Sequence, residues 1–125
     1  MENYKNSETT DLIIKCFYNV YNQLGYGFLE KVYEKSMFIE LKNSGLFVEH
    51  QKPISVYYKE QQVGKYYADL IVSESVIIEI KAAETLCEEH EFQLINYHKA
   101  TDIGVGHLLN FGKKPQIKRK IYSNQ

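Results

Sequence analysis

The chain has 125 residues, of which 44% are hydrophobic, 25% charged and 14% aromatic. This length and composition are typical of one globular domain with a buried core, and they exclude a disordered or fibrous protein. The formal net charge of -1 excludes attraction of nucleic acid by the whole molecule, so a polyanion would have to bind a local patch. We predict a single domain that spans residues 1–125.

The two cysteines, Cys16 and Cys87, are too few for a disulfide framework and lack the spacing of a metal site. Such thiols suit a reducing compartment. No apolar run approaches the roughly 18 residues of a membrane-spanning helix. We therefore expect a soluble, cytoplasmic protein without a membrane partner.

Two helices are predicted at the start of the chain. Apolar residues recur at helical spacing over 11–24, with Thr10 or Asp11 as the N-cap and Gly25 as the stop. A second helix follows a short glycine hinge and ends at Gly45, with one apolar side. That side comprises Leu29, Val32, Tyr33, Met37 and Leu41.

From Leu46 onward the apolar pattern changes to alternation, which predicts strands. Turns are expected at 60–64 and 73–75, and successive strands should pair as one meander. The expected strands are 46–51, 54–59, 65–72 and 76–82.

The acidic stretch 84–91 opens a third predicted helix, which runs to about Ala100 and has its glutamates near the positive N-terminal end. Two further strands are expected over 104–112 and 116–122. This order of elements predicts a mixed α/β (α+β) domain built on one sheet flanked by helices.

Asp69, Glu79 and Lys81 are charged residues in segments that otherwise have the pattern of buried strands. Alternation places Glu79 and Lys81 on one face, and the short turn should bring Asp69 within reach of Glu79. A bound cation would explain two buried carboxylates, and oxygen ligands favour Mg²⁺ or Mn²⁺. On these residues alone, a solvated face with a surface ion pair is the more common arrangement.

Three further features bear on this choice. The segment "GFLEKVY" has the form G-x-x-E-x-x-Y, in which Glu30 and Tyr33 share one side of a helix. The segment "YYADLIV" places Asp69 directly before an apolar strand. On the third helix, the i, i+4 spacing of Gln93 and Tyr97 puts both on one face.

Together these segments resemble the GxxExxY protein family, a branch of small proteins in the PD-(D/E)XK nuclease superfamily, over nearly the whole chain. The residues that carry the resemblance are Gly27, Glu30, Tyr33, Ala68, Asp69, Leu70, Glu79, Ile80, Lys81, Gln93, Tyr97, Asn110, Phe111 and Gly112. One departure is Ala68, which stands where the superfamily's nominal proline precedes the aspartate and which removes no chemical group. The resemblance implies a restriction-endonuclease-like core, with a mixed β-sheet flanked by helices.

The resemblance also implies a metal-dependent hydrolytic site. Asp69 and Glu79 would ligate Mg²⁺ or Mn²⁺, with the backbone carbonyl of Ile80 as a further ligand. Lys81 would orient the attacking water or help to deprotonate it. Glu30 would complete the site from the helix or bind a second metal. A metal and a nearby lysine both assist attack on a phosphodiester, because they stabilise the negative charge that develops on oxygen.

Gln93 and Tyr97 resemble the Gln-x-x-x-Tyr element of RecB-like nucleases, which positions the substrate or the catalytic lysine. The catalytic residues implied in this way are Glu30, Asp69, Glu79, Lys81, Gln93 and Tyr97. We accordingly expect a nuclease that hydrolyses phosphodiester bonds in nucleic acid, in DNA rather than RNA. The alternatives are a non-catalytic module that keeps the fold and binds nucleic acid or a protein, and a dimeric assembly subunit that binds neither metal nor nucleic acid.

The histidines show no pattern that indicates a metal site or a catalytic base. His90, His98 and His107 lack a metal-type spacing and a partner nucleophile, so surface or strand positions are expected, with only His90 near the site. The basic segment 113–120 would either contact phosphates or form a solvated edge of the sheet.

Tyrosines occur as adjacent pairs at 57–58 and 66–67. In a strand, alternation predicts that one residue of each pair lies in the core and the other on the surface. Exposed tyrosines could stack on bases or form the interface of a homodimer, and the homodimer is the stronger expectation.

Overall fold

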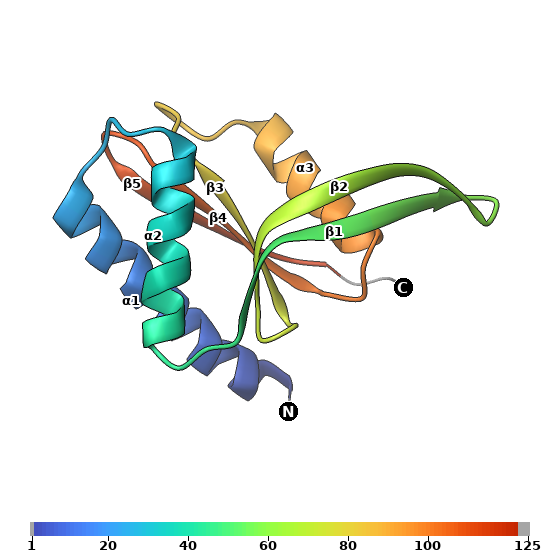
Figure 1. Ribbon diagram of the computed structural model, residues 1–125, viewed down its shortest axis with the longest axis horizontal. Helices are drawn as coiled ribbons and strands as arrows, with labels where there is room; N and C mark the ends of the chain where they lie inside the picture. Colours follow the sequence, from blue (N-terminus) through green and yellow to red (C-terminus); the bar gives the residue numbers. More distant parts are fainter. Residues whose placement is uncertain (1, 123–125) are drawn as a thin grey trace.

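The computed structural model describes residues 2–122, with side chains from Ser7 onward. Figure 1 shows one twisted sheet with helices on both faces. The helices are α1 (Glu2–Leu24), α2 (Glu30–Asn43) and α3 (Glu88–Lys99), and the strands are β1 (Val48–Tyr58), β2 (Gln61–Val72), β3 (Val76–Lys81), β4 (Val105–Phe111) and β5 (Pro115–Ile121). The strands lie in the order β1-β2-β3-β4-β5.

The sheet is mixed because β3 and β4 run parallel, whereas the other neighbouring strands are antiparallel. A parallel pair needs a crossover, and α3 provides it between β3 and β4. The predicted meander is therefore right for β1 to β3 and ends at the centre of the sheet. The fold class predicted from sequence, one mixed sheet flanked by helices, is confirmed.

The two faces of the sheet carry separate parts of the core. Phe17 from α1 and Met37 from α2 pack with Ile80 on one face. Leu94 from α3 packs with Ile77 on the other face. Because successive side chains of β3 point to opposite faces, the residues that alternate with Ile80 lie on the α3 side. This alternation directs the charged residues of β3 toward α3.

The first helix is longer than predicted. It begins at Glu2, so Thr10 is a buried residue inside the helix, and neither Thr10 nor Asp11 is its N-cap. The apolar period starts only at Leu12, and a polar first segment of a helix has no such period. Gly25 ends the helix as predicted, with a φ of 69° that glycine adopts most readily.

The second helix buries most of the predicted apolar side, with two exceptions and one addition. Leu29 and Val32, expected on the apolar side, are exposed, and Glu34 is buried instead. The residues buried as predicted are Tyr33, Met37 and Leu41. The buried side of the helix therefore includes a carboxylate beside the predicted apolar residues.

Of the G-x-x-E-x-x-Y segment, Tyr33 lies in the first turn of α2 and Gly27 lies in the loop that precedes this helix. The Tyr33 hydroxyl donates to the Gly25 carbonyl at 2.7 Å and accepts from the Phe28 N–H at 3.2 Å. Its ring stacks on Phe111, with the centroids 4.3 Å apart. Gly27 has a φ of 111°, which a residue with a Cβ rarely adopts. These two motif residues therefore fix the start of α2 relative to the sheet.

The strand β1 joins two segments that the sequence predicts as separate strands. One irregular point of the strand is Gln51, whose φ of 53° interrupts the alternation. The residues on either side pair regularly, His50 with Leu70 and Lys52 with Ala68. The hairpin to β2 closes through residues 59–60, so the predicted turn at 60–64 is mostly strand. Figure 1 shows this hairpin extending beyond the rest of the sheet, alongside α3.

The third helix starts at Glu88, later than predicted, with Cys87 as its N-cap. Its first turn carries the expected glutamates, Glu88, Glu89 and Glu91. The last two strands lie where the sequence places them, and β5 is an edge of the sheet. Within residues 2–122, no helix has the length and apolar character needed to cross a membrane.

Candidate nuclease site

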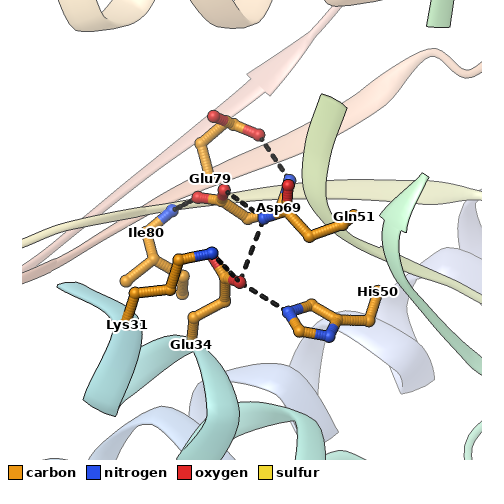
Figure 2. Close-up of polar contacts among 7 residues, drawn as sticks. All are labelled: Lys31, Glu34, His50, Gln51, Asp69, Glu79 and Ile80. Carbon is orange, nitrogen blue, oxygen red and sulfur yellow. Dashed lines mark hydrogen bonds and ion pairs between the residues drawn. The ribbon is translucent and has the colours of Figure 1, made fainter. Parts of the chain in front are cut away.

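Asp69 and Glu79 lie where β2 and β3 separate. Regular pairing ends at Leu70 and Ile78, and hydrogen bonds from side chains continue the connection. The Asp69 N–H donates to Glu79 Oε2 at 3.0 Å. The Ile80 N–H donates to Asp69 Oδ2 at 2.8 Å. Each carboxylate thus accepts a backbone N–H from the other's strand (Figure 2), and the two acids lie next to each other as alternation and the short turn predict.

Removal from water raises the pKa of both acids. Burial raises the pKa of Glu79 from 4.5 to about 8, and repulsion from Asp69 adds to the effect. Burial also raises the pKa of Asp69 from 3.8 to about 6, against the opposing effect of the Ile80 N–H. At neutral pH Glu79 is therefore mostly protonated, and a cation that binds the pair would have to displace this proton.

Glu34, to which no sequence motif points, is a third carboxylate at this place. His50 Nε2 lies 2.5 Å from Glu34 Oε2, and Lys31 Nζ lies 3.9 Å from the same oxygen. Gln51 Nε2 donates to Glu34 Oε2 at 3.0 Å and to Asp69 Oδ1 at 3.4 Å, so it bridges the two acids (Figure 2). Burial opposes the charged form of Glu34, but hydrogen bonds with His50, Gln51 and Asp69 outweigh burial and lower its pKa.

Glu30, the helix acid implied by the family resemblance, lies apart from these carboxylates. It is the first residue of α2 and is exposed, and no polar contact joins it to Asp69 or Glu79 among the residues that the structure describes. Its role stays a prediction. The signal that could have indicated Glu34 is its place three residues before the buried Met37, on the side of the helix that faces the sheet.

Lys81 leads from the carboxylate pair to α3. Its Nζ donates to Gln93 Oε1 at 3.2 Å, and Gln93 Nε2 donates to the Tyr97 hydroxyl at 3.2 Å. Burial raises the pKa of Tyr97 to about 12, and the nearby Glu79 adds to this effect. The Tyr97 hydroxyl therefore keeps its proton at neutral pH. The structure thus places Gln93 and Tyr97 in one polar chain with Lys81.

The histidines differ in part from their expected positions. His98 is a buried helix residue whose Nδ1 lies 2.7 Å from the Ile103 carbonyl oxygen, so the expectation of a surface or strand position is wrong. His107 lies in β4 as a fully buried residue. Among the residues that the structure describes, no polar contact joins His90 to Gln93. The Nδ1 of His90 instead accepts a hydrogen bond from the Cys87 N–H at the start of α3.

The four paired tyrosines are all exposed, so the expectation that one of each pair lies in the core is wrong. They are Tyr57, Tyr58, Tyr66 and Tyr67. Alternation places one residue of a pair in the core only where a layer covers that face of the sheet, and this hairpin projects past the helices (Figure 1).

The residues fit a divalent cation that is held partly by solvent and substrate. In the part of the chain that the structure describes, no group of three or more His, Cys, Asp or Glu side chains is arranged to hold a metal ion. Mg²⁺ is usually bound by one or two carboxylates together with waters and phosphate oxygens. Asp69 and Glu79 supply two carboxylates, and their raised pKa values show that burial disfavours their charged forms, which a bound cation would offset.

Comparison with known proteins places this site in a family. The family described as the PD-(D/E)XK nuclease superfamily matches residues 7–120. No curated protein matches significantly. A solved structure described as "Crystal structure of SSO0001" is similar, with a TM-score of 0.63 and 17% sequence identity over 76% of this chain. This chain spans 50% of the length of that protein, and a similarity at this identity shows a shared fold alone.

The sheet topology and the family match agree. The mixed sheet with helices on both faces is consistent with a restriction-endonuclease-like core. Its paired carboxylates, Asp69 and Glu79, precede Lys81 in the order that the superfamily name abbreviates. Since the match extends over nearly the whole sequence, this chain belongs to the PD-(D/E)XK nuclease superfamily.

Proposed function

We propose that this chain is a metal-dependent nuclease that hydrolyses phosphodiester bonds, with DNA as its main substrate. The observation that carries this proposal is the pair of half-buried Asp69 and buried Glu79, each of which accepts a backbone N–H from the other's strand, beside Lys81. A divalent cation would compensate the charge of both acids here, because burial disfavours their charged forms. Membership of a nuclease superfamily supports the same chemistry.

The residues of the site have distinct proposed roles. Asp69 and Glu79, with the backbone carbonyl of Ile80, would hold Mg²⁺ or Mn²⁺, which when bound would acidify a water and offset charge on the phosphate. Lys81 carries an ammonium group that orients the attacking water and stabilises negative charge on the phosphate oxygens. Gln93 accepts from Lys81 and so fixes the direction of its Nζ.

Two glutamates of α2 have different proposed tasks. Glu34 positions Asp69 through Gln51, because that amide donates to both acids. Glu30 stands exposed at the start of the helix, where it could contact substrate or bind a second metal. Comparison of Glu34→Gln with Glu30→Gln separates these roles.

The finer family assignment is also a proposal. The set of motif residues supports the GxxExxY family and its RecB-like branch, and the polar chain from Lys81 through Gln93 to Tyr97 supports a positioning role for the last two. An alignment of proteins with this motif should place Glu30 and Lys81 in columns of glutamate and lysine. Other residues in those columns would contradict the assignment.

The nuclease proposal is tested with purified protein and Mg²⁺ or Mn²⁺ on plasmid DNA, linear duplex, single-stranded DNA and RNA. We expect cleavage that chelation abolishes and that is lost in Glu79→Gln and Lys81→Ala. Glu74→Gln and Lys65→Ala are matched controls, since both residues are exposed and lie outside the site. If wild type and all variants show the same trace cleavage, the protein is not a nuclease.

One observation favours a second candidate, a binding module that keeps the fold without catalysis. Asp69 and Glu79 each already accept a backbone N–H, as carboxylates with a purely structural task do. Calorimetric titration with Mn²⁺ separates the candidates. Heat of binding that Asp69→Asn removes favours the nuclease, and its absence in the wild type favours the module.

A further inference from the structure

A groove of about 820 Å³ lies between the β1–β2 hairpin and α3. Its hairpin wall includes Tyr57 and Tyr66, and its helix wall includes Phe92, Gln93 and Tyr97. Its volume falls within the roughly 300–1,000 Å³ of small-molecule sites. Figure 1 shows the hairpin alongside the helix, so the two walls come from segments far apart in the sequence.

Large aromatic surfaces are open to solvent on both walls. The exposed fractions are 63% for Tyr57, 52% for Tyr66 and 58% for Phe92. The rings of Tyr66 and Tyr97 are in contact, with their centroids 6.0 Å apart. Exposed aromatic rings that gather on facing walls usually mark a binding surface.

The hairpin contains an irregularity that contributes Tyr57 to this wall. The pairing of β1 with β2 shifts between Val56 and Tyr57. Both of these consecutive residues line the groove, although consecutive residues of a regular strand point to opposite faces. Bulges of this kind redirect a side chain, and they are frequent next to active sites.

The groove adjoins the proposed nuclease site through Gln93 and Tyr97. Gln93 and Tyr97 form part of its helix wall, and Gln93 also accepts the hydrogen bond from Lys81 Nζ at 3.2 Å. A molecule in the groove would therefore be separated from Lys81 by one side chain, that of Gln93.

We propose that this groove binds an unpaired stretch of nucleic acid, with bases stacked on Tyr57, Tyr66 and Phe92 and the strand leading to Lys81. This inference rests on the proposed function and specifies its substrate class. Aromatic rings bind the flat faces of bases, and in a duplex those faces are covered by the neighbouring base pairs. Only an unpaired nucleotide can present them to a groove between a hairpin and a helix.

The charge in the groove supports binding by stacking. Its charged lining residues are Lys99 and Glu89, whose charges cancel. Asn96 adds an amide that can hydrogen-bond to a base edge. Because few phosphates would be neutralised here, the affinity should fall less steeply with salt than in a groove lined by lysine and arginine.

The test uses the full chain in EDTA, where no cleavage occurs, and fluorescence anisotropy of labelled oligothymidylate, oligouridylate and a duplex of equal length. We expect the single strands to bind at least about tenfold more tightly than the duplex. Tyr57→Ala, Tyr66→Ala and Phe92→Ala should each weaken single-strand binding about 5- to 100-fold. Tyr66→Phe keeps the stacking surface and should bind within about twofold of the wild type.

Tyr58→Ala and Tyr67→Ala are matched controls. Their side chains are exposed to 63% and 50%, almost as in the groove tyrosines, but they do not line the groove. We expect both to bind like the wild type. Equal losses in groove and control variants, or tighter binding of the duplex, would overturn the inference. The thymidylate and uridylate arms distinguish a DNA strand from an RNA strand.

Two further outcomes separate single-strand binding from dimer formation and from catalysis. If sedimentation shows a dimer that Tyr57→Ala dissociates, the groove holds a second copy of the chain and the inference is wrong. If single strands bind as expected but wild-type protein with Mg²⁺ or Mn²⁺ cleaves none of them, the binding inference stands and the nuclease proposal fails.

Discussion

The imidazole of His50 and the carboxylate of Glu34 are 2.5 Å apart, which joins β1 to α2 directly beside Asp69. Gln51, the residue after His50, donates to the same Glu34 oxygen and to Asp69. The left-handed backbone of Gln51 allows this irregular stretch of β1 to face the helix. Glu34 is thereby kept charged, and its negative charge contributes to the raised pKa of Asp69.

Replacement of Glu34 should impair the nuclease more than replacement of Glu30. Glu34→Gln removes the charge and weakens the contacts that orient Asp69. We therefore expect the rate of cleavage to fall about 10- to 100-fold, as it does when residues that hydrogen-bond to metal ligands are replaced. Glu30→Gln, at an exposed position one turn earlier, should stay within about threefold of the wild type. Initial rates with Mg²⁺ measure both effects. The opposite ranking would give the helix-acid role to Glu30.

Divalent cations should stabilise the protein more at higher pH. The folded-state pKa values of Asp69 and Glu79, about 6 and about 8, lie above their ordinary values of 3.8 and 4.5. The folded state therefore binds more protons than the unfolded state, and stability from these groups is lost as pH rises from about 4 to about 8. Mg²⁺ binds the charged pair and offsets this loss, so the increase in Tm should be larger at pH 8 than at pH 6.

Thermal melts with and without Mg²⁺ at several pH values check this expectation. In Glu79→Gln the pair carries one charge fewer, so the metal-free protein should lose less stability as pH rises and the increase with Mg²⁺ should largely vanish. An increase in Tm that is the same at all pH values, in wild type and variant alike, would indicate binding elsewhere.

Gln93 should act on catalysis and leave metal binding unchanged. Its amide joins Lys81 Nζ to the Tyr97 hydroxyl and touches neither carboxylate in the described contacts. Gln93→Ala frees the lysine, and we expect kcat to fall about tenfold or more with an unchanged Kd for Mn²⁺. Tyr97→Phe keeps the ring and removes the hydroxyl, so its loss should be smaller. A weakened Mn²⁺ affinity in Gln93→Ala would show that the residue supports the metal site instead.

His107 should make the protein sensitive to mild acid. Burial lowers its pKa from 6.5 to about 4, and Arg119 acts in the same direction. Neither ring nitrogen has a hydrogen-bond partner among the described residues. The unfolded state binds the proton first, so stability present above pH 6.5 is lost as pH falls toward 4, by about 3 kcal/mol at most.

Urea unfolding at pH 7 and at pH 5 measures this loss. Asp69 and Glu79 change stability in the opposite direction over the same range, so the comparison needs His107→Leu as a reference. The wild type should lose more stability than the variant between the two values. Equal losses would mean that His107 does not titrate during unfolding.

The pairing of Asp69 with Glu79 was predictable because it depends on local rules. The two acids stand on either side of one short turn, and alternation and antiparallel pairing suffice to bring them together. Lys81 and the Gln93–Tyr97 spacing follow equally from the periods of a strand and a helix. The order of helices and strands, and hence the fold class, rests on the same periods.

Glu34 and the tyrosines were not predictable in this way, because they depend on how far one layer covers another. The rotation of α2 against the sheet decides whether Glu34 or Val32 is buried, and both lie close to the apolar side of the helix. Alternation assigns Tyr57 and Tyr66 to faces, but only the length of the hairpin relative to α3 leaves them exposed. The periodicity of a single sequence specifies neither the rotation of α2 against the sheet nor the length of the hairpin relative to α3.

The parallel pairing of β3 with β4 has a consequence for folding in the cell. On the ribosome, the meander of β1 to β3 emerges before α3 and β4, so β3 is an uncovered edge until β4 has been synthesised. Its apolar run, broken only by Glu79 and Lys81, has the composition of an aggregation-prone segment. These two charges therefore also act as gatekeepers, and neutral substitutions at either position should lower the soluble yield of nascent protein even where the finished fold tolerates them.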